Sequence, residues 1–229
     1  MRKTSVSPLL LGTSLAWPDG RLTAASVTLV QPKTGMNLLV DTGAWHQRKA
    51  LLARLNERGI APTQIDSIIL THLHWDHCVN FDLFAGVPIA VPRGEWDRVQ
   101  RETIDTATPI YLHELLSAHA NITLIEPGEY SGVEIIPTPG HTSGHIAVGV
   151  VTTDYSVAIA GDALPTRTAA FSGMPHTWHS DENDAAMSIS RLLKDFDVIV
   201  PGHDAAFSTG IRDLLLPGPQ GPRNERADD

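Results

Sequence analysis

The chain has 229 residues, of which 42% are hydrophobic and 19% are charged, and its net charge is −9 with the histidines neutral. This length and composition predict one domain with a sizeable core and exclude an intrinsically disordered chain. The acidic balance leaves no overall electrostatic footprint for nucleic acid, so we expect a small-molecule substrate as the partner.

The cysteine content and the lengths of the apolar runs indicate the cellular compartment in which the protein is expected. The single cysteine, Cys78, excludes an intrachain disulfide and fits a reducing compartment. We interpret it as a small buried residue rather than a nucleophile or a metal ligand. No apolar run approaches the length of a membrane span. We therefore expect a cytoplasmic protein without a membrane segment.

The first half of the chain predicts several strands and a long helix. Pro18-Asp19-Gly20 is a turn signal between two apolar stretches, which together predict a hairpin. Leucines at helical spacing predict a helix over 46–58, and a second helix is expected over 93–103. A further helix is expected within 104–120, a stretch that is either a lid over a site or an ordinary surface connection. The expected strands cover 8–16, 20–30, 36–40, 65–70 and 87–92.

The second half is richer in strands and contains one clear amphipathic helix over 181–195. The expected strands cover 121–127, 133–140, 145–151, 156–163 and 197–203. Because each half runs strands first and then a helix, we expect an α/β fold of two similar β-rich halves, with the sheets packed together and the helices outside. One domain is expected over 1–216, followed by a flexible tail over 217–229, and the stretch 166–180 is expected to be a loop.

The stretch THLHWDH, residues 71–77, has the strongest chemical signal in the chain. It places three imidazoles and a carboxylate within six positions, directly after an Ile-rich run that predicts a buried strand. Imidazole nitrogens and carboxylate oxygens are ligands that suit zinc and related divalent metals. Ligands on a loop after a strand are held rigidly and still reach an open site. The expected ligands are His72, His74, Asp76 and His77.

Three more residues of ligand type follow predicted strands later in the chain. His141 lies in TPGHTSGH, Asp162 in AIAGDA and His203 in VPGHD. Each lies close to a glycine at a strand end, where the backbone turns tightly and the side chain projects. Together the motifs supply five histidines and two aspartates, which suffice for two metal ions.

In this order and context, the four motifs resemble those of the metallo-β-lactamase-fold hydrolase superfamily, from DTG at 41–43 to PGHD at 201–204. The resemblance implies the metallo-β-lactamase fold, a four-layer αβ/βα sandwich. It also implies two metal sites joined by a bridging Asp162. The first site would comprise His72, His74 and His141. The second would comprise Asp76, His77 and His203.

The resemblance further implies two Zn²⁺ ions per chain, with iron or manganese as alternatives, and His74 favours zinc. Asp41 in DTG and His145 in HTSGH match family positions whose side chains do not bind the metal but lie next to the residues that do. A carboxylate in such a position accepts an imidazole N–H and fixes the tautomer of the ring. The alternatives are a plain turn residue for Asp41 and an ordinary histidine for His145.

The function implied is hydrolysis at a dinuclear zinc site. A metal-bridging hydroxide would attack a small ester, lactone or thioester carbonyl, with Asp76 and Asp162 as the catalytic carboxylates. The alternatives are a phosphodiesterase or ribonuclease, and a non-hydrolytic metal-binding or redox protein. Three tryptophans are expected either to border the substrate pocket or to lie in the core. They are Trp45, Trp75 and Trp178.

Two branches of the superfamily are most similar to this chain. N-acyl homoserine lactonases share THLHxDH and TPGHTxGH, but they usually have a tyrosine where this chain has Pro165. A compact branch linked to ribonuclease activity on histone pre-messenger RNA shares DTGAW and the stretch leading into VIVPGHDAAF. The sequence leaves the substrate open between these branches, and a homodimer is a possible assembly.

Overall fold

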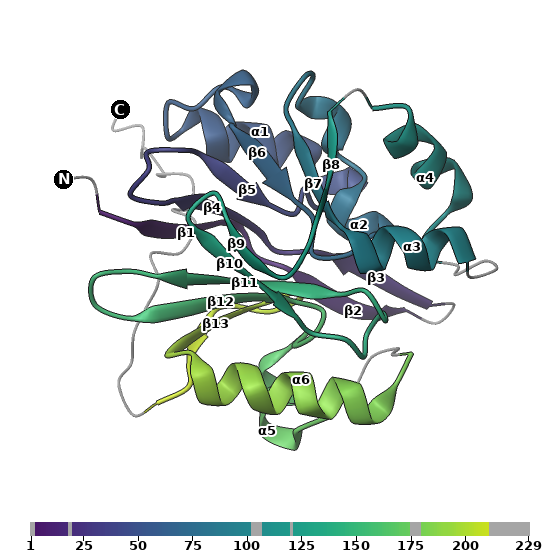
Figure 1. The fold of residues 1–229 in the computed structure, drawn as a ribbon, viewed down its shortest axis with the longest axis vertical. Helices are drawn as coiled ribbons and strands as arrows, with labels where there is room; N and C mark the ends of the chain where they lie inside the picture. The colour runs from purple at the N-terminus through teal and green to yellow at the C-terminus, as the bar shows by residue number, and fades with distance from the viewer. Residues whose placement is uncertain (1–2, 18–19, 102–106, 120, 175–179, 211–229) are drawn as a thin grey trace, which may run out of the picture.

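The computed structural model describes residues 3–17, 20–101, 107–119, 121–174 and 180–210, and two six-stranded sheets form its centre (Figure 1). The first sheet contains, in order across it, β1 (Ser5–Leu10), β4 (Val27–Gln31), β5 (Leu38–Val40), β6 (Ser67–Ile69), β7 (Ile89–Pro92) and β8 (Ile122–Ile125). The second contains, in order, β14 (Phe207–Ser208), β13 (Val198–Pro201), β12 (Ser156–Gly161), β11 (Ile146–Val151), β10 (Val133–Pro137) and β9 (Gly128–Tyr130).

Helices cover the outer faces of both sheets. They are α1 (Arg48–Asn56), α2 (Trp75–Cys78), α3 (Arg93–Arg101), α4 (Ile110–Ser117), α5 (Arg167–Ser172) and α6 (Glu182–Asp195), with short 3-10 turns at Trp45–Gln47, Pro62–Gln64 and Phe81–Leu83. Figure 1 shows α1 to α4 on the side of the first sheet and α5 and α6 on the side of the second. This order of layers confirms the predicted four-layer sandwich.

Apolar side chains fill the spaces between these layers. Between the sheets, Val40 and Ile69 of the first sheet belong to the same fully buried cluster as Val148 and Val200 of the second. A separate cluster joins the outer face of the second sheet to α6 through Ile189. Because both faces of each sheet are covered, the central strands are nearly continuous apolar runs, which explains why the sequence shows them clearly.

Parallel strand pairs bring the motif loops to one edge of each sheet. β5 runs parallel to β6, and β12 runs parallel to β13. The carboxyl ends of parallel neighbours lie at the same edge of a sheet, which is where ligands bind in many α/β proteins. Asp41 therefore lies beside the 71–77 loop, and Asp162 lies beside His203.

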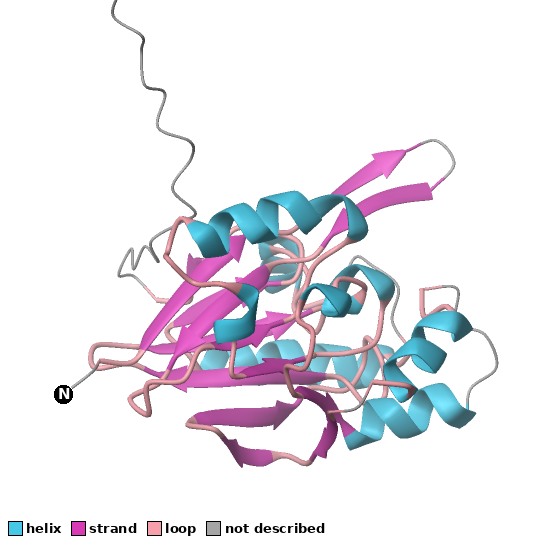
Figure 2. Ribbon diagram, turned by 90° about the horizontal axis from the view of Figure 1, so that it is seen from above, coloured by secondary structure: helices cyan, strands magenta, loops and turns pink. Residues whose placement is uncertain are grey.

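The predicted first hairpin differs from the structure in the extent of its strands. β2 (Thr13–Trp17) pairs with β3 (Gly20–Ala24) in a hairpin that projects from the body of the molecule (Figure 2), whereas β1 pairs with β4. The break between β1 and β2 lies at Gly12, where a Cβ would collide with the carbonyl oxygen of Gly202. The N–H of Gly12 donates to Ser26 Oγ over 2.9 Å. The strand ends here because the chain passes directly over the loop that contains His203.

The stretch 166–180 is not wholly a loop, because α5 occupies Arg167–Ser172 and Thr166 Oγ1 accepts the N–H of Ala169 at its start. Six helical residues are too few to show a helical period in the sequence. The helix expected within 104–120 is confirmed as α4. The predicted tail over 217–229 lies outside the described residues and stays a prediction, as does the domain boundary at 216. Within the described ranges, no helix has both the length and the apolar character needed to cross a membrane.

Candidate metal centre

All seven predicted ligand residues meet where the motif loops of the two sheets converge. They form three overlapping groups, and within each group the ligand atoms lie within 4.8 Å of one another. Every member is buried. The groups are His72, His74 and His141; His72, His77 and Asp162; and Asp76, His77 and His203. The first and third groups are the two predicted metal sites, although which residues bind a metal stays a prediction.

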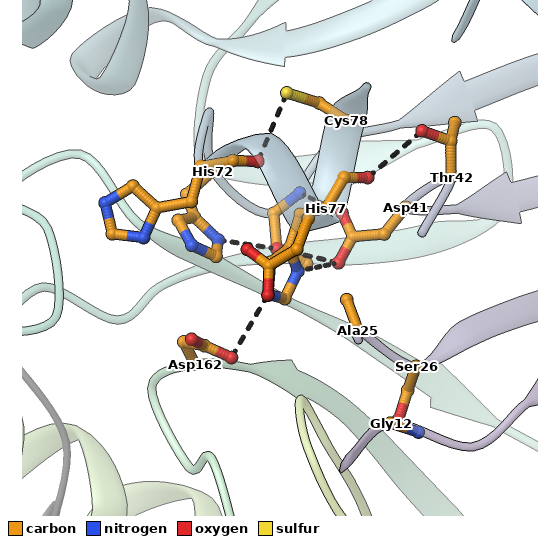
Figure 3. A network of polar contacts seen from close by, with 12 residues as sticks. Gly12, Ala25, Ser26, Asp41, Thr42, His72, His77, Cys78 and Asp162 are labelled. Carbon is orange, nitrogen blue, oxygen red and sulfur yellow. Dashed lines mark hydrogen bonds and ion pairs between the residues drawn. The ribbon is translucent and has the colours of Figure 1, made fainter. Parts of the chain in front are cut away.

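The carboxylate of Asp162 lies between these two sites. Its Oδ2 is 3.3 Å from His141 Nε2, which belongs to the first site, and 3.1 Å from His203 Nε2, which belongs to the second. Its Oδ1 is 3.2 Å from His77 Nε2, also in the second site. In Figure 3, His77 lies between the carboxylates of Asp41 and Asp162. Asp162 is thus placed to contact an ion in either site.

Hydrogen bonds from outside the cluster orient three of the rings. His77 Nδ1 donates to Asp41 Oδ2 over 2.7 Å, and His203 Nδ1 donates to the carbonyl oxygen of Ala24 over 3.0 Å. His72 Nδ1 is 3.0 Å from the hydroxyl of Thr71, which itself donates to Asp41. Because that hydroxyl hydrogen is already used, His72 Nδ1 is the donor. Each ring therefore keeps Nε2 for the interior of the cluster, as metal-binding histidines do.

Three atoms that point into the cluster are buried polar atoms without a hydrogen-bond partner among the described residues. They are His72 Nε2, His77 Nε2 and Asp162 Oδ1, and the last two lie close together without hydrogen-bond geometry. Such unsatisfied groups are rare in folded proteins and call for an explanation. Imidazole nitrogens and a carboxylate oxygen that face one another suit a divalent cation such as zinc. The residues present therefore fit the metal that the family implies.

Opposing charges set the protonation of the site when no metal is bound. Burial lowers the pKa of His77, but the charges of Asp162 and Asp41 outweigh burial and hold that pKa well above its ordinary value. Burial likewise opposes protonation of His203, yet Asp162 raises its pKa. His72 differs, because burial and the neighbouring histidines hold its pKa well below the ordinary value. Burial would raise the pKa of Asp162, but His203 and His77 hold it well below normal.

For a protein loaded with one ion in each of the two predicted sites, these directions predict that the two ions are lost separately as the pH falls. A ligand ring must give up its proton before it binds metal, so a raised pKa makes the proton a stronger competitor. His77 and His203 have raised pKa values and share the second site, whereas His72 in the first site has a lowered pKa. We therefore expect the second site to release its ion at a higher pH than the first.

Elemental analysis after dialysis at a series of pH values from about 8 to about 5 tests this order. We expect two ions per chain to fall to one and then to none. In a His203→Ala variant the step at higher pH should be missing, while the step at lower pH remains. Simultaneous loss of both ions from the wild-type protein, or loss of the lower step in the variant, would contradict the expected order.

The two predicted supporting residues both contact the cluster from behind. Asp41 accepts hydrogen bonds from the N–H and the hydroxyl of Thr71 and from His77 Nδ1. His145 Nε2 accepts the backbone N–H of Asp162 over 3.1 Å, and its Nδ1 lies 2.9 Å from the hydroxyl of Thr138. Burial holds the pKa of His145 well below normal, so its neutral ring remains an acceptor. It positions the backbone of Asp162 rather than facing the cluster.

Sequence reasoning missed two buried polar residues near the site. Asn80 Nδ2 donates to the carbonyl oxygens of three successive residues and so fixes the turn after β5. Glu95 on α3 is fully buried and accepts the N–H of Leu73, between two ligand histidines. No local pattern distinguishes this glutamate from an exposed helical one. Cys78 is buried as predicted, and burial holds its pKa well above normal, so it is not a ready nucleophile.

The three tryptophans expected near the pocket occupy different environments. Trp45 is 62% exposed and stacks against the guanidinium of Arg48 at 4.6 Å. Trp75 is half-buried and packs against the core between the first sheet and its helices. Trp178 lies outside the described residues. A role in binding substrate therefore stays a prediction for all three.

Residues 20–203 match the model of the metallo-beta-lactamase superfamily. The chain belongs to this family. It is 33% identical over 198 residues to metallo-beta-lactamase domain-containing protein 1 of Xenopus laevis, a match that covers 86% of this chain and 76% of the relative. It is 31% identical over 167 residues to an N-acyl homoserine lactonase of a Bacillus species, covering 69% of this chain and 63% of the lactonase.

A solved quorum-quenching N-acyl homoserine lactone lactonase shares the fold with a TM-score of 0.69 at 24% identity, covering 89% of this chain and 92% of that one. The fold is thus the metallo-β-lactamase fold expected from the motifs. The chain is accordingly a metallo-β-lactamase superfamily hydrolase with clustered His and Asp residues for metal.

Proposed function

We propose that this protein is a dinuclear zinc hydrolase of a small ester, lactone or thioester. The observation that carries the proposal is the position of Asp162, whose carboxylate is within 3.3 Å of His141 on one side and within 3.2 Å of His77 and His203 on the other. A carboxylate that lies between two ligand sets fits a site that holds two metal ions. Zinc is favoured because histidine dominates the donor set.

Two zinc ions, when bound, would lower the pKa of water toward about 7 and polarise the oxygen of a bound carbonyl. The residues of the chain supply the positioning. We assign to the Asp76 carboxylate, whose Oδ2 lies 3.7 Å from His203 Nε2, the role of orienting the attacking water and taking its proton. The Asp41 carboxylate holds the ring of His77, and His145 holds the backbone of Asp162. These contacts reduce the reorganisation that the site needs during the reaction.

The relatives support a carbonyl substrate, because one of them is an N-acyl homoserine lactonase. Pro165 offers no hydroxyl to a substrate, and its carbonyl oxygen accepts the N–H of His203 over 2.8 Å. We therefore infer hydrolysis of a small carbonyl substrate without choosing among lactones, esters and thioesters. A phosphodiester is the second candidate, because the motifs also resemble the compact branch of the superfamily that is linked to ribonuclease activity. The similarity to metallo-beta-lactamase domain-containing protein 1 also covers more of the chain than the similarity to the lactonase. The net charge of −9 disfavours a polyanionic substrate.

A hydrolysis screen of the zinc-loaded protein tests the proposal. It would compare acyl lactones, esters and thioesters with phosphodiesters, using His74→Ala to disrupt the first site and His46→Ala as a matched control at an exposed histidine. We expect turnover of a carbonyl substrate that is lost in His74→Ala and kept in His46→Ala. Turnover of phosphodiesters alone would support the second candidate. Turnover that survives in both variants would contradict a metal-dependent reaction at this site.

A further inference from the structure

The first metal site is assembled from two loops that belong to different sheets. His72 and His74 follow β6 of the first sheet, whereas His141 follows β10 of the second. Among the described residues the two sheets share no strand pairing, so the distance between these ligands depends on the packing of the sheets and on contacts between the loops. One such contact is the hydrogen bond from the N–H of Ile146 to the carbonyl oxygen of Thr71. Thr71 directly precedes His72, whereas Ile146 lies five residues after His141.

Glu95 makes a second and more direct link between the same two loops. Its Oε1 accepts the N–H of Leu73 over 3.1 Å, at the residue between His72 and His74. Its Oε2 accepts the hydroxyl of Thr142 over 2.7 Å, at the residue after His141. One carboxylate therefore holds the chain next to all three ligands of the first site. Among the described residues, Glu95 makes no hydrogen bond or ion pair with Asp76, His77 or His203, which form the second site.

The backbone around Glu95 shows that α3 and the 141–145 turn are in direct contact. A Cβ on Gly144 would collide with the backbone N and Cα of Glu95. Glycine at this position lets the turn lie against the first residues of the helix. The Glu95–Thr142 bond is thus made at a tightly packed junction and not by a side chain reaching through open space.

The carboxylate of Glu95 is fully buried, and Arg98 balances its charge. Arg98 Nη2 lies 2.7 Å from Glu95 Oε1, and both side chains are almost completely inaccessible to solvent. Burying an ion pair costs desolvation energy that its attraction often fails to recover, so such a pair is weak evidence for a stabilising role. Because Glu95 accepts hydrogen bonds from both ligand loops, its role is more simply explained by fixing the position of one loop relative to the other.

We propose that Glu95 is a positioning residue that joins the two ligand loops and so sets the geometry of the site formed by His72, His74 and His141. This inference rests on the proposed two-metal function. Groups that orient ligands from behind typically change metal affinity by about 10–100-fold when they are removed. Glu95 acts on the ligand residues indirectly, through the backbone N–H of Leu73 and the hydroxyl of Thr142. Its effect should fall on one metal site and leave the other nearly unchanged.

Cobalt(II) titration of the metal-free protein tests this. The variants are Glu95→Gln, which keeps the shape of the side chain but removes its charge, and Thr142→Val, which removes only the hydroxyl. Asp97→Asn on the same helix is the matched control, because its half-buried carboxylate pairs with the exposed Arg101 and, among the described residues, has no hydrogen bond to either ligand loop. The readouts are the two dissociation constants, from competition with a chelator, and the visible spectrum of the bound cobalt, which reports its coordination geometry.

We expect Glu95→Gln to weaken one of the two cobalt sites by about 10-fold or more and to alter its spectrum. Thr142→Val should act in the same direction with a smaller effect, and Asp97→Asn should match the wild type. Repeating Glu95→Gln in a His203→Ala background, where the first site remains, should keep the loss of affinity. Repeating it in a His141→Ala background, where the second site remains, should nearly abolish the loss.

The wild-type titration separates the two ideas. Fewer than two cobalt ions bound to the wild type would remove the proposed function and this inference with it. Two ions in the wild type, with both sites weakened equally by Glu95→Gln, would leave the function standing and overturn the positioning role. The same holds if Thr142→Val weakens both sites equally. Denaturant unfolding of the metal-free variants shows whether a general loss of stability underlies an equal effect.

Discussion

Replacing Asp162 with asparagine is expected to remove hydrolytic activity and at least one of the two proposed metal ions. The carboxylate lies within 3.3 Å of histidines from both predicted sites. Asparagine keeps the shape but presents an uncharged amide, whose N–H groups would face His77, His141 or His203. We expect activity to fall by more than the roughly 10–100-fold that follows loss of a group behind the ligands.

Activity and metal content are measured together on the purified variant, with Asp154→Asn as the control. Asp154 lies in the exposed turn between β11 and β12, so the same chemical change there should alter neither quantity. Because Asp162 is buried, the unfolding transition of the metal-free variant must also be recorded. Full activity with two bound ions in Asp162→Asn would show that the carboxylate does not join the two sites.

The second large effect is expected for Asp41→Asn. Asp41 accepts hydrogen bonds from the backbone and the hydroxyl of Thr71 and from His77 Nδ1. Its φ is +59°, a left-handed conformation that asparagine tolerates about as well as aspartate, so the variant changes charge without new backbone strain. The asparagine amide can accept hydrogen bonds only at its oxygen, because its nitrogen is a donor. Either His77 or Thr71 therefore loses its partner, and we expect a fall of about 10–100-fold in metal affinity and activity.

Zinc competition with a chelator and the rate of substrate turnover give the two readouts for Asp41→Asn. Asp66→Asn is the matched control, because Asp66 is an exposed carboxylate that also accepts a backbone N–H, from Asn37. It precedes β6 at the opposite end of that strand, away from the cluster. We expect the control to behave as the wild type does. Equal effects of the two variants would mean that Asp41 acts on folding and not on the ring of His77.

The fold and the seven clustered residues could be predicted because their signals are local. Strands covered on both faces are apolar along their whole length, and β13 shows this in four consecutive buried residues. The clustered residues follow β6, β10, β12 and β13 in the chain, so short motifs indicate which residues cluster before any tertiary contact is known. The amphipathic α6 was equally visible, whereas the six-residue α5 was too short to show a period.

Features that depend on contacts between distant segments were not predicted. The predicted first hairpin extends too far because nothing near Gly12 in the sequence reveals that the loop of Gly202 crosses over it. The sequence indicates an ordinary helix around Glu95, since the partners of this residue, Leu73 and Thr142, come from loops 22 and 47 residues away. The sequence does not decide the role of His145, because its contact with the backbone of Asp162 forms only in three dimensions.

The family, the layered fold and the set of clustered His and Asp residues can be predicted from the amino-acid sequence. They follow from strand composition and from short motifs after strands, which are properties of neighbouring residues. The orientation of the rings, the position of Asp162 between two residue groups and the link that Glu95 makes between two loops become visible only in the folded protein. Those properties depend on the packing of one sheet against the other, because hydrogen bonds and charge pairs between segments far apart in the chain form only when both sheets are in place.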